Sequence, residues 1–209
     1  MDVLSQDFPT NSFGIKAGSN STWFGQLSEN NNQDGLKFGY HFGIWSRFKL
    51  SPNGFYIQPE IIYSLTGAKS KGVHQATHYD NEGGSFPVTL SGGSDISVSS
   101  ISVPILFGKT FKSNQLNFRT YLGFVPGYIT DAKEKSHMAI PELNQNYAGT
   151  YTLNNSINRF QAKGQIGIGL DRSRFSFDLN YQNQLTNFYK NDTKYKINGF
   201  SASIGIRLF

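Results

Sequence analysis

The 209-residue sequence contains no cysteine, which excludes disulfides, thiolate metal sites and a cysteine nucleophile. It also has no apolar run approaching the 18 residues of a transmembrane helix. Charged residues are scarce at 16%, whereas aromatic residues reach 15%, a balance that is uncommon for a soluble enzyme. It suits a β-barrel that faces lipid, because the apolar residues of such a barrel alternate with polar ones and dilute the average hydropathy.

The chain does not open with the basic and apolar segments of a secretory signal peptide. We expect residues 1–6 to be a mature start with an added methionine. The formal charge of +5 would suit a nucleic-acid partner. The cations, however, are spread along predicted strands and turns and form no basic helix or arm, so the pattern does not favour nucleic-acid binding.

Apolar and polar residues alternate with a period of two in most of eight separate runs, which predicts eight β-strands. The clearest run extends from Lys37 to Leu50, with Phe38, Tyr40 and Phe42 on one face. The runs begin near Ser12, Lys37, Phe55, Ser100, Leu116, Phe160, Phe175 and Phe200. An even number of strands puts both termini at one end of a closed sheet.

The connections between the predicted strands fall into two classes of length. Turns of about four residues occur at 51–54, 112–115 and 171–174, whereas long polar stretches occupy 22–35, 69–95, 131–157 and, more briefly, 189–194. Transmembrane β-barrels show this asymmetry, with short periplasmic turns and long extracellular loops. The sequence therefore predicts an all-β fold, an eight-stranded antiparallel up-and-down transmembrane β-barrel over residues 12–209, after an N-terminal periplasmic tail at 1–11.

One face of the predicted strands carries most of the aromatic residues, and the other carries the charges. We expect the aromatic-rich face to point outward to lipid, at Phe42, Ile44, Ile61, Ile105, Leu122, Ile168 and Leu179. A soluble ligand-binding barrel of the lipocalin or streptavidin type would point this face inward. The alternation of apolar and polar residues is the same in both orientations and does not distinguish them, but the asymmetry of the connections favours the membrane.

Four segments carry a resemblance to a known family: residues 13–20 (FGIKAGSN), 54–64 (GFYIQPEIIYS), 101–106 (ISVPIL) and 203–209 (SIGIRLF). They resemble the PorT-type small outer-membrane barrels of Bacteroidetes, which are often described as porin-family proteins or outer membrane protein beta-barrel domains. The resemblance implies a location in the outer membrane of a Gram-negative bacterium. The family includes a protein required for type IX secretion, but a shared barrel does not transfer that role.

The inward face is expected to hold an ion-pair cluster of Glu60, Arg47, Arg119, Asp178 and Lys163. An eight-stranded barrel is just wide enough for side chains to fill it, and a buried carboxylate must be paired. We therefore predict a plugged lumen that conducts poorly, in which Glu60 bonds Arg47, Arg119 or both beside Trp45. The alternative is a small anion-preferring pore lined by unpaired cations.

The sequence also contains residues that could form a metal site or a catalytic site. His74, His78 and Asp80 could supply three ligands to Zn²⁺ or Cu²⁺, but their spacing in a polar stretch is common by chance, so we expect no metal and no cofactor. The four histidines form no nucleophile–base constellation, so we expect no enzyme. Aromatic residues among small polar ones suit adaptable contact surfaces. We therefore expect a non-enzymatic barrel in outer-membrane lipid whose loops or wall contact a protein partner, for example as an accessory of a larger outer-membrane or secretion complex.

Overall fold

The computed structural model describes residues 11–25, 33–79, 84–113, 116–191 and 195–209. Within these ranges, no helix is long and apolar enough to cross a membrane. The elements are β1 (Asn11–Phe24), β2 (Gln33–Gly35), β3 (Lys37–Lys49), β4 (Phe55–Tyr79), β5 (Ser85–Ser102), β6 (Ile105–Phe111), β7 (Asn117–Ile140), the 3-10 helix η1 (Pro141–Leu143), β8 (Gln145–Thr152), β9 (Phe160–Arg172), β10 (Phe175–Gln184) and β11 (Ile197–Arg207).

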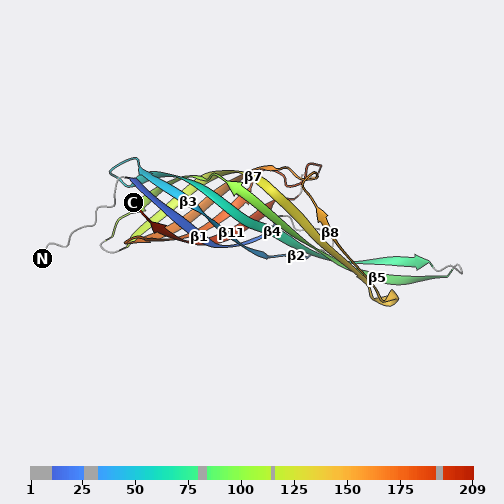
Figure 1. Cartoon of the computed structure of the whole chain (residues 1–209). Coiled ribbons are helices and arrows are strands. Elements are labelled where there is room, and N and C mark those ends of the chain that lie inside the picture. The colour runs from blue at the N-terminus through green and yellow to red at the C-terminus, as the bar shows by residue number, and fades with distance from the viewer. Residues whose placement is uncertain (1–10, 26–32, 80–83, 114–115, 192–194) are drawn as a thin grey trace.

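The strands close into a ring. The hydrogen-bonded order runs β4-β3-β1-β11-β10-β9-β7-β5, and β5 pairs back onto β4, so that the ring passes through eight strands, all antiparallel. After a break at Val103 and Pro104, β6 continues the path of β5 and pairs with β4 and β7. Each ring strand lies beside its neighbours in the sequence, which is consistent with the predicted up-and-down topology. Figure 1 shows a long cylinder with the C-terminus at one end.

Short connections gather at the end of the cylinder that holds the C-terminus (Figure 1). They join β3 to β4, β6 to β7, and β9 to β10. The last is a tight turn of Ser173 and Arg174, in which Ser173 has a φ of 53°. The predicted turns at 51–54 and 171–174 are therefore confirmed, although β9 continues two residues into the latter, to Arg172, and the predicted turn at 112–115 includes two residues outside the described ranges.

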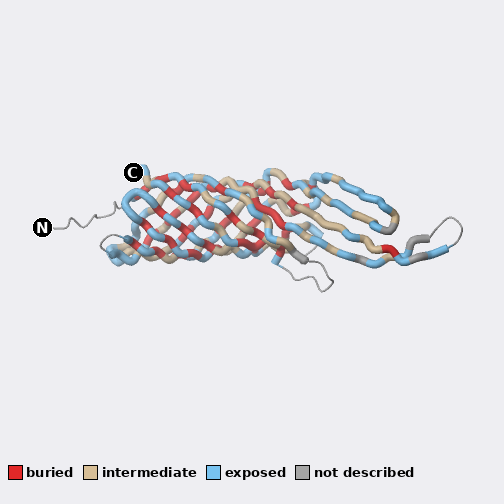
Figure 2. Tube along the Cα trace, turned by 90° about the horizontal axis from the view of Figure 1, so that it is seen from below, coloured by how far each residue is buried: buried red, intermediate tan, exposed pale blue. Residues whose placement is uncertain are grey.

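Two of the predicted long loops are strands instead. β4 and β5 stay paired from Ile62 with Ser102 as far as Tyr79 with Ser85. β7 and β8 pair from Lys133 with Thr152 to Ile140 with Gln145. These two hairpins extend beyond the cylinder (Figures 1 and 2). The prediction of loops at 69–95 and 131–157 was wrong because hairpin strands outside the ring need no apolar face, so their sequences lack the alternation that identifies a strand.

The outward direction of the aromatic-rich face is confirmed. The seven positions expected to face lipid are between 36% and 65% exposed: Phe42, Ile44, Ile61, Ile105, Leu122, Ile168 and Leu179. Figure 2 shows buried and exposed residues alternating along the strands of the ring. An exposed apolar surface that continues around the strands of the ring is typical of contact with a membrane or another protein. The soluble ligand-binding barrel, which requires this face to surround a ligand, is contradicted.

The exposed apolar surface leads to a testable expectation for Leu122, which is 65% exposed on β7. If this surface contacts lipid, Leu122→Arg should lower the free energy of unfolding in lipid vesicles by up to about 2–4 kcal/mol. The matched control is Thr150→Arg, an equally drastic change at an exposed position of β8. Urea titration of the folded fraction measures both variants. Equal tolerance of the two arginines would contradict the lipid contact.

Candidate functional site

The interior of the ring holds a network of charged side chains, here called the lumen cluster. It combines three cations with three carboxylates, one from each of β1, β3, β4, β7, β9 and β10: Lys16, Arg47, Glu60, Arg119, Asp171 and Asp178. Arg119 is fully buried, and Glu60 and Asp178 are each 3% exposed. Equal numbers of opposite charges make the cluster neutral, which is the arrangement that buried ions require.

Glu60 is held by two neighbours. The Lys16 ammonium donates to Glu60 Oε1 at 2.9 Å and to Oε2 at 3.1 Å, and it lies 3.9 Å from Asp178 Oδ2. The Gln58 amide donates to Glu60 Oε1 at 2.6 Å. Trp45 is directly opposite Glu60 in the register of β3 and β4, as predicted. Glu60 therefore ties β1 to β4 across the intervening strand β3.

The two arginines share a second carboxylate. Arg47 donates to Asp171 Oδ2 at 2.7 Å and to Gln58 Oε1 at 2.7 Å, while its guanidinium lies 5.0 Å from the Trp45 ring centroid. Arg119 Nε is 2.9 Å from the same Asp171 oxygen, and Arg119 Nη2 donates to Asp178 Oδ1 at 2.8 Å. The bonds of Arg47 to Asp171 and of Arg119 Nη2 to Asp178 are charge-assisted hydrogen bonds, which are among the strong ones of proteins, whereas the Arg119 Nε contact is an ion pair without a hydrogen bond. They connect β3, β7, β9 and β10.

Glycines on the inward face make this network possible. Gly169 is paired with Arg119 on one side and with Asp178 on the other. Because it has no side chain, Arg119 reaches across β9 to Asp178. Gly43 likewise lies beside Lys16, which crosses β3 to reach Glu60. The larger inward aromatic side chains follow the same rule, since each lies directly opposite a glycine: Trp45 with Gly14, Tyr56 with Gly108, and Tyr121 with Gly167.

The predicted pairing of Glu60 was wrong. Its cationic partner is Lys16, whereas both arginines bond other carboxylates. The sequence reading considered Arg47 because it is a diagonal neighbour, and it overlooked a lysine that reaches across a glycine. It also missed Asp171, which was assigned to a turn although its side chain is 7% exposed. Lys163 is partly buried but forms no ion pair with any residue that the structure describes, so it stands outside the network.

His41 and Ser203 form a second polar contact in the lumen. His41 Nε2 lies 2.8 Å from Ser203 Oγ, and the two residues are 7% and 4% exposed. The adjoining cavity, lined also by Lys16, Glu60 and Lys163, measures about 50 Å³. This space is large enough for only a few water molecules. A base beside a hydroxyl is a feature of hydrolases, but this pair lies in a space too small for a substrate.

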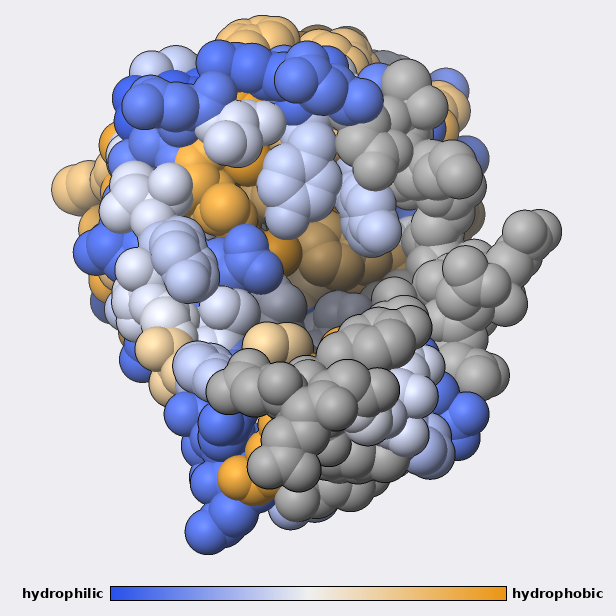
Figure 3. Space-filling view, turned by 90° about the vertical axis from the view of Figure 1, so that its right-hand side faces the viewer, coloured by the Kyte–Doolittle hydropathy of each residue, from blue (hydrophilic) through white to orange (hydrophobic). Residues whose placement is uncertain are grey.

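An apolar cluster, here called the mouth cluster, fills the ring at the end opposite the short turns. Its buried members are Phe24, Ala68, Ile96, Val98, Ile129, Ala132, Leu153, Ile157, Phe188 and Ile197. Two connections contribute to this cluster: the segment between β8 and β9, and the segment after β10. Hydrogen bonds join them, because the Asn158 amide of the first donates to the carbonyls of Asn187 and Tyr189 in the second, at 3.0 and 3.2 Å. Seen from this end, apolar surface is visible inside a hydrophilic rim (Figure 3).

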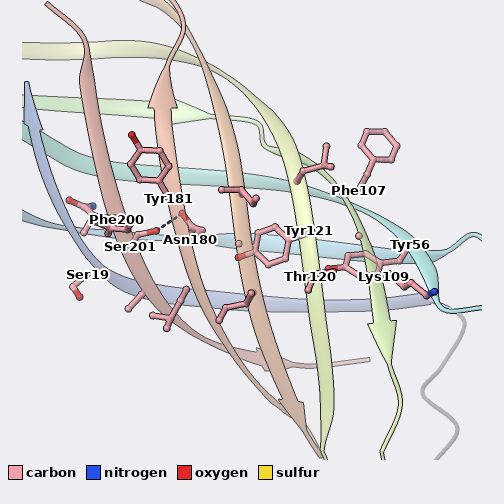
Figure 4. Close-up of a pocket in the computed structure, with 18 of the residues that line it drawn as sticks. Ser19, Tyr56, Phe107, Lys109, Thr120, Tyr121, Asn180, Tyr181, Phe200 and Ser201 are labelled. Carbon is pink, nitrogen blue, oxygen red and sulfur yellow. Dashed lines mark hydrogen bonds between the residues drawn. The ribbon is translucent and has the colours of Figure 1, made fainter. Parts of the chain in front are cut away.

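Of the concavities outside the lumen, two are the largest described. One, of about 620 Å³, covers the mouth cluster and is lined by Phe24, Ile96, Glu134, Tyr189 and Tyr195 among others. The other, of about 1000 Å³, follows the wall, and lipid-facing side chains such as Leu122 and Ile166 line it. Figure 4 shows Phe107, Tyr181 and Phe200 along it, with Ser201 bonded to Asn180. Its apolar lining suits hydrocarbon chains and has no cluster of reactive groups.

The weak metal-site hypothesis concerned His74, His78 and Asp80. His74 and His78 lie on β4, but their side chains and the whole of Asp80 fall outside the described residues. Elsewhere in the described part of the chain, no group of three or more histidine, aspartate or glutamate side chains could hold a metal ion.

Gly169→Ala tests whether the lumen cluster stabilises the fold. The added Cβ would lie 2.6 Å from both Arg119 Nη2 and Asp178 Oδ1, so that at least one of the two side chains must shift away from the other's present position. Breaking a buried ion pair costs about 3–5 kcal/mol, so we expect a clearly lower thermal stability in detergent. Gly164→Ala on the same strand is the control, because nothing lies within 4 Å of its added Cβ. Similar melting temperatures for the two variants would contradict a stabilising network.

Comparisons with solved structures give distant similarities. Ail of Yersinia pestis, in complex with the heparin analogue sucrose octasulfate, shares 11% identity over 96% of this chain and 100% of its own, with a TM-score of 0.44. Neisserial surface protein A shares 11% identity over 95% and 99%, with a TM-score of 0.46. The outer membrane enzyme PagL shares 12% identity over 94% and 98%, with a TM-score of 0.42. Similarity of this degree carries no statement about activity.

The comparison with protein families is more specific. Comparison with curated proteins gives no significant match. A family model described as "Outer membrane protein beta-barrel domain" matches residues 5–190, which is most of the chain. The match does not separate PorT-type members from others. The chain belongs to the outer membrane protein beta-barrel domain family and is located in the bacterial outer membrane.

Proposed function

We propose that the protein is a non-conducting, non-enzymatic transmembrane barrel that acts through contacts of its long hairpins with a protein partner. The observation that carries this proposal is the filled interior. The lumen cluster occupies one level of the ring and the mouth cluster another, and the polar cavity beside the lumen cluster measures about 50 Å³. Because its interior is occupied by side chains, the barrel would bind a partner through its outer surface.

The proposed orientation places the short turns in the periplasm and the two hairpins at the cell surface. Short turns at one end and long excursions at the other support this orientation, because membrane barrels have short periplasmic turns. Residues 1–11 would form a periplasmic tail, and residues 12–209 a single barrel. The strands of the hairpins would then carry the wall well beyond the bilayer.

The alternatives of an enzyme and an anion pore find less support. An enzyme would need its nucleophile and base within reach of a substrate, whereas His41 and Ser203 are both buried beside a small cavity. An anion pore would need several unpaired lumen cations. Lys16, Arg47 and Arg119 are each paired with a carboxylate, which supports a plug and not a path for ions.

The free edge of β8 is the proposed contact for the partner. In the described part of the chain, β8 pairs with β7 alone, so its other edge presents unpaired backbone groups. Its sequence QNYAGTYT contains no charge and no proline, the devices that usually protect an edge strand. Tyr147 and Tyr151 are 52% and 59% exposed. Such an edge suits the addition of an extended strand from another protein. An accessory role in a larger outer-membrane or secretion complex, as in the PorT-type resemblance, fits this kind of contact.

Photo-crosslinking in intact cells tests this proposal. A photoreactive amino acid at Tyr147 or Tyr151 should give a discrete adduct with one protein. Lysine substitution at Thr150 and Thr152, which adds edge charges next to the probe at Tyr151, should reduce that adduct at least severalfold. The matched control is Val73→Lys, at a position 54% exposed on β4. A probe that captures only lipid, or an adduct unaffected by the edge lysines, would contradict a strand-addition contact.

A further inference from the structure

Lysines gather on the outward face of the hairpin strands, beyond the apolar wall. Residues of β4, β5 and β7 that lie side by side form rows across the three strands. The last row in which all three residues are apolar or aromatic is Tyr63–Ile101–Tyr128. The rows four, six and eight residues further along β4 are Gly67–Ser97–Lys133, Lys69–Asp95–Lys135 and Lys71–Gly93–His137. We call Lys69, Lys71, Lys133 and Lys135 the outer lysine patch.

A β-bulge directs the two β7 lysines to this face. Ser100 pairs with Ile129, but Ser99 pairs with Asp131, so that Thr130 is an extra residue in β7. An extra residue reverses the faces of the strand that follows it. Ala132 consequently enters the mouth cluster, where it is fully buried, and Lys133 joins the outward face. Without the bulge, both lysines would point into the apolar cluster.

The patch has more positive charge than its neighbours neutralise. Lys69 lies 3.8 Å from Asp95, which also bonds Lys37, and Lys133 lies 3.2 Å from Asp131. Lys71 and Lys135 are exposed and have no ion-pair partner among the described residues. Since neighbouring strands are about 4.8 Å apart, β4 and β7 stand about 10 Å apart. Between them, β5 contributes Gly93, Asp95 and Ser97. The His137 ring lies over Gly93, and Lys37 bonds Asp95 and Ser97, so the exposed ends of the patch lysines are the groups that this face offers to a phosphate.

We infer that the outer lysine patch binds phosphate groups on the sugar headgroup of an outer-leaflet glycolipid, a lipopolysaccharide. With a rise of about 3.3 Å per residue and a strand tilt of about 40°, the lysine rows stand about 10–20 Å above the last apolar row. The polar region of an ordinary phospholipid leaflet extends only about 5–8 Å beyond the hydrocarbon. A taller phosphorylated headgroup matches the height of the patch, and its acyl chains would lie against the apolar wall. The inference rests on the proposed orientation of the barrel.

The test titrates lipopolysaccharide into the purified full-length protein in detergent and uses the melting temperature of the protein to measure binding. Lipopolysaccharide should stabilise the native protein in a saturable manner, whereas dephosphorylated lipopolysaccharide and inorganic phosphate should not. Replacing the four patch lysines with glutamine should weaken binding by about fivefold per lysine, and replacing them with arginine should preserve it. The control removes the same charge at the other end of the barrel, by Lys49→Gln, Lys112→Gln, Arg172→Gln and Arg174→Gln.

Three outcomes would overturn the inference: equal loss of binding in the control, equal stabilisation by inorganic phosphate, or undiminished binding to dephosphorylated lipopolysaccharide. Unheated gel mobility shows whether each variant is folded, and the arginine variant provides a second reading if the glutamine variant does not fold. Detergent solution has no inside or outside and contains no partner protein. A failure here therefore leaves the strand-addition contact of β8 intact, and a failure of crosslinking leaves this binding result intact.

Discussion

The rest of the structure depends on the need to pair buried charge inside a narrow ring. Taking ions out of water costs several kcal/mol each, so a carboxylate such as Glu60 is tolerated only with a close cation and further hydrogen bonds. Lys16 and Gln58 supply them, and Arg47 and Arg119 do the same for Asp171 and Asp178. Arg119 reaches Asp178 across the single strand β9, at Gly169, whereas Arg47 reaches Asp171 across the lumen, because β3 and β9 lie opposite each other in the ring. The network joins six of the ring strands directly, and it fixes their register from within.

Much of the fold could be predicted from alternation, because a strand between lipid and a polar interior has chemically distinct faces. This is why the outward direction of residues such as Leu122 was correct. The hairpin strands were missed because they extend beyond the ring, where neither face needs to be apolar and serine, glycine and lysine serve equally well. The pairing of Glu60 failed for a different reason. Contacts were counted between adjacent strands, whereas Lys16 reaches Glu60 across β3, beside Gly43. The glycine opposite each bulky inward residue is the signal that could have found such contacts.

A filled interior changes where function is sought. The proposed non-conducting barrel carries two hairpins, one with a free edge at β8 and one contributing Lys69 and Lys71 to a basic face. These two features suit different ligands: unpaired backbone groups suit a strand of another protein, and clustered lysines suit phosphate groups. The bulge at Thr130 serves both the interior and the surface, since it turns Ala132 inward and Lys133 outward.

Ion conductance in planar lipid bilayers tests the filled lumen most directly. The proposed plug consists of the lumen cluster and the mouth cluster, and it predicts that the purified protein inserts without producing stable, reproducible current steps. Insertion must be verified in the same sample by protection of the wall from protease. Steady anion-selective steps from the inserted protein would contradict the account, because they require a continuous path through the lumen cluster past Arg119.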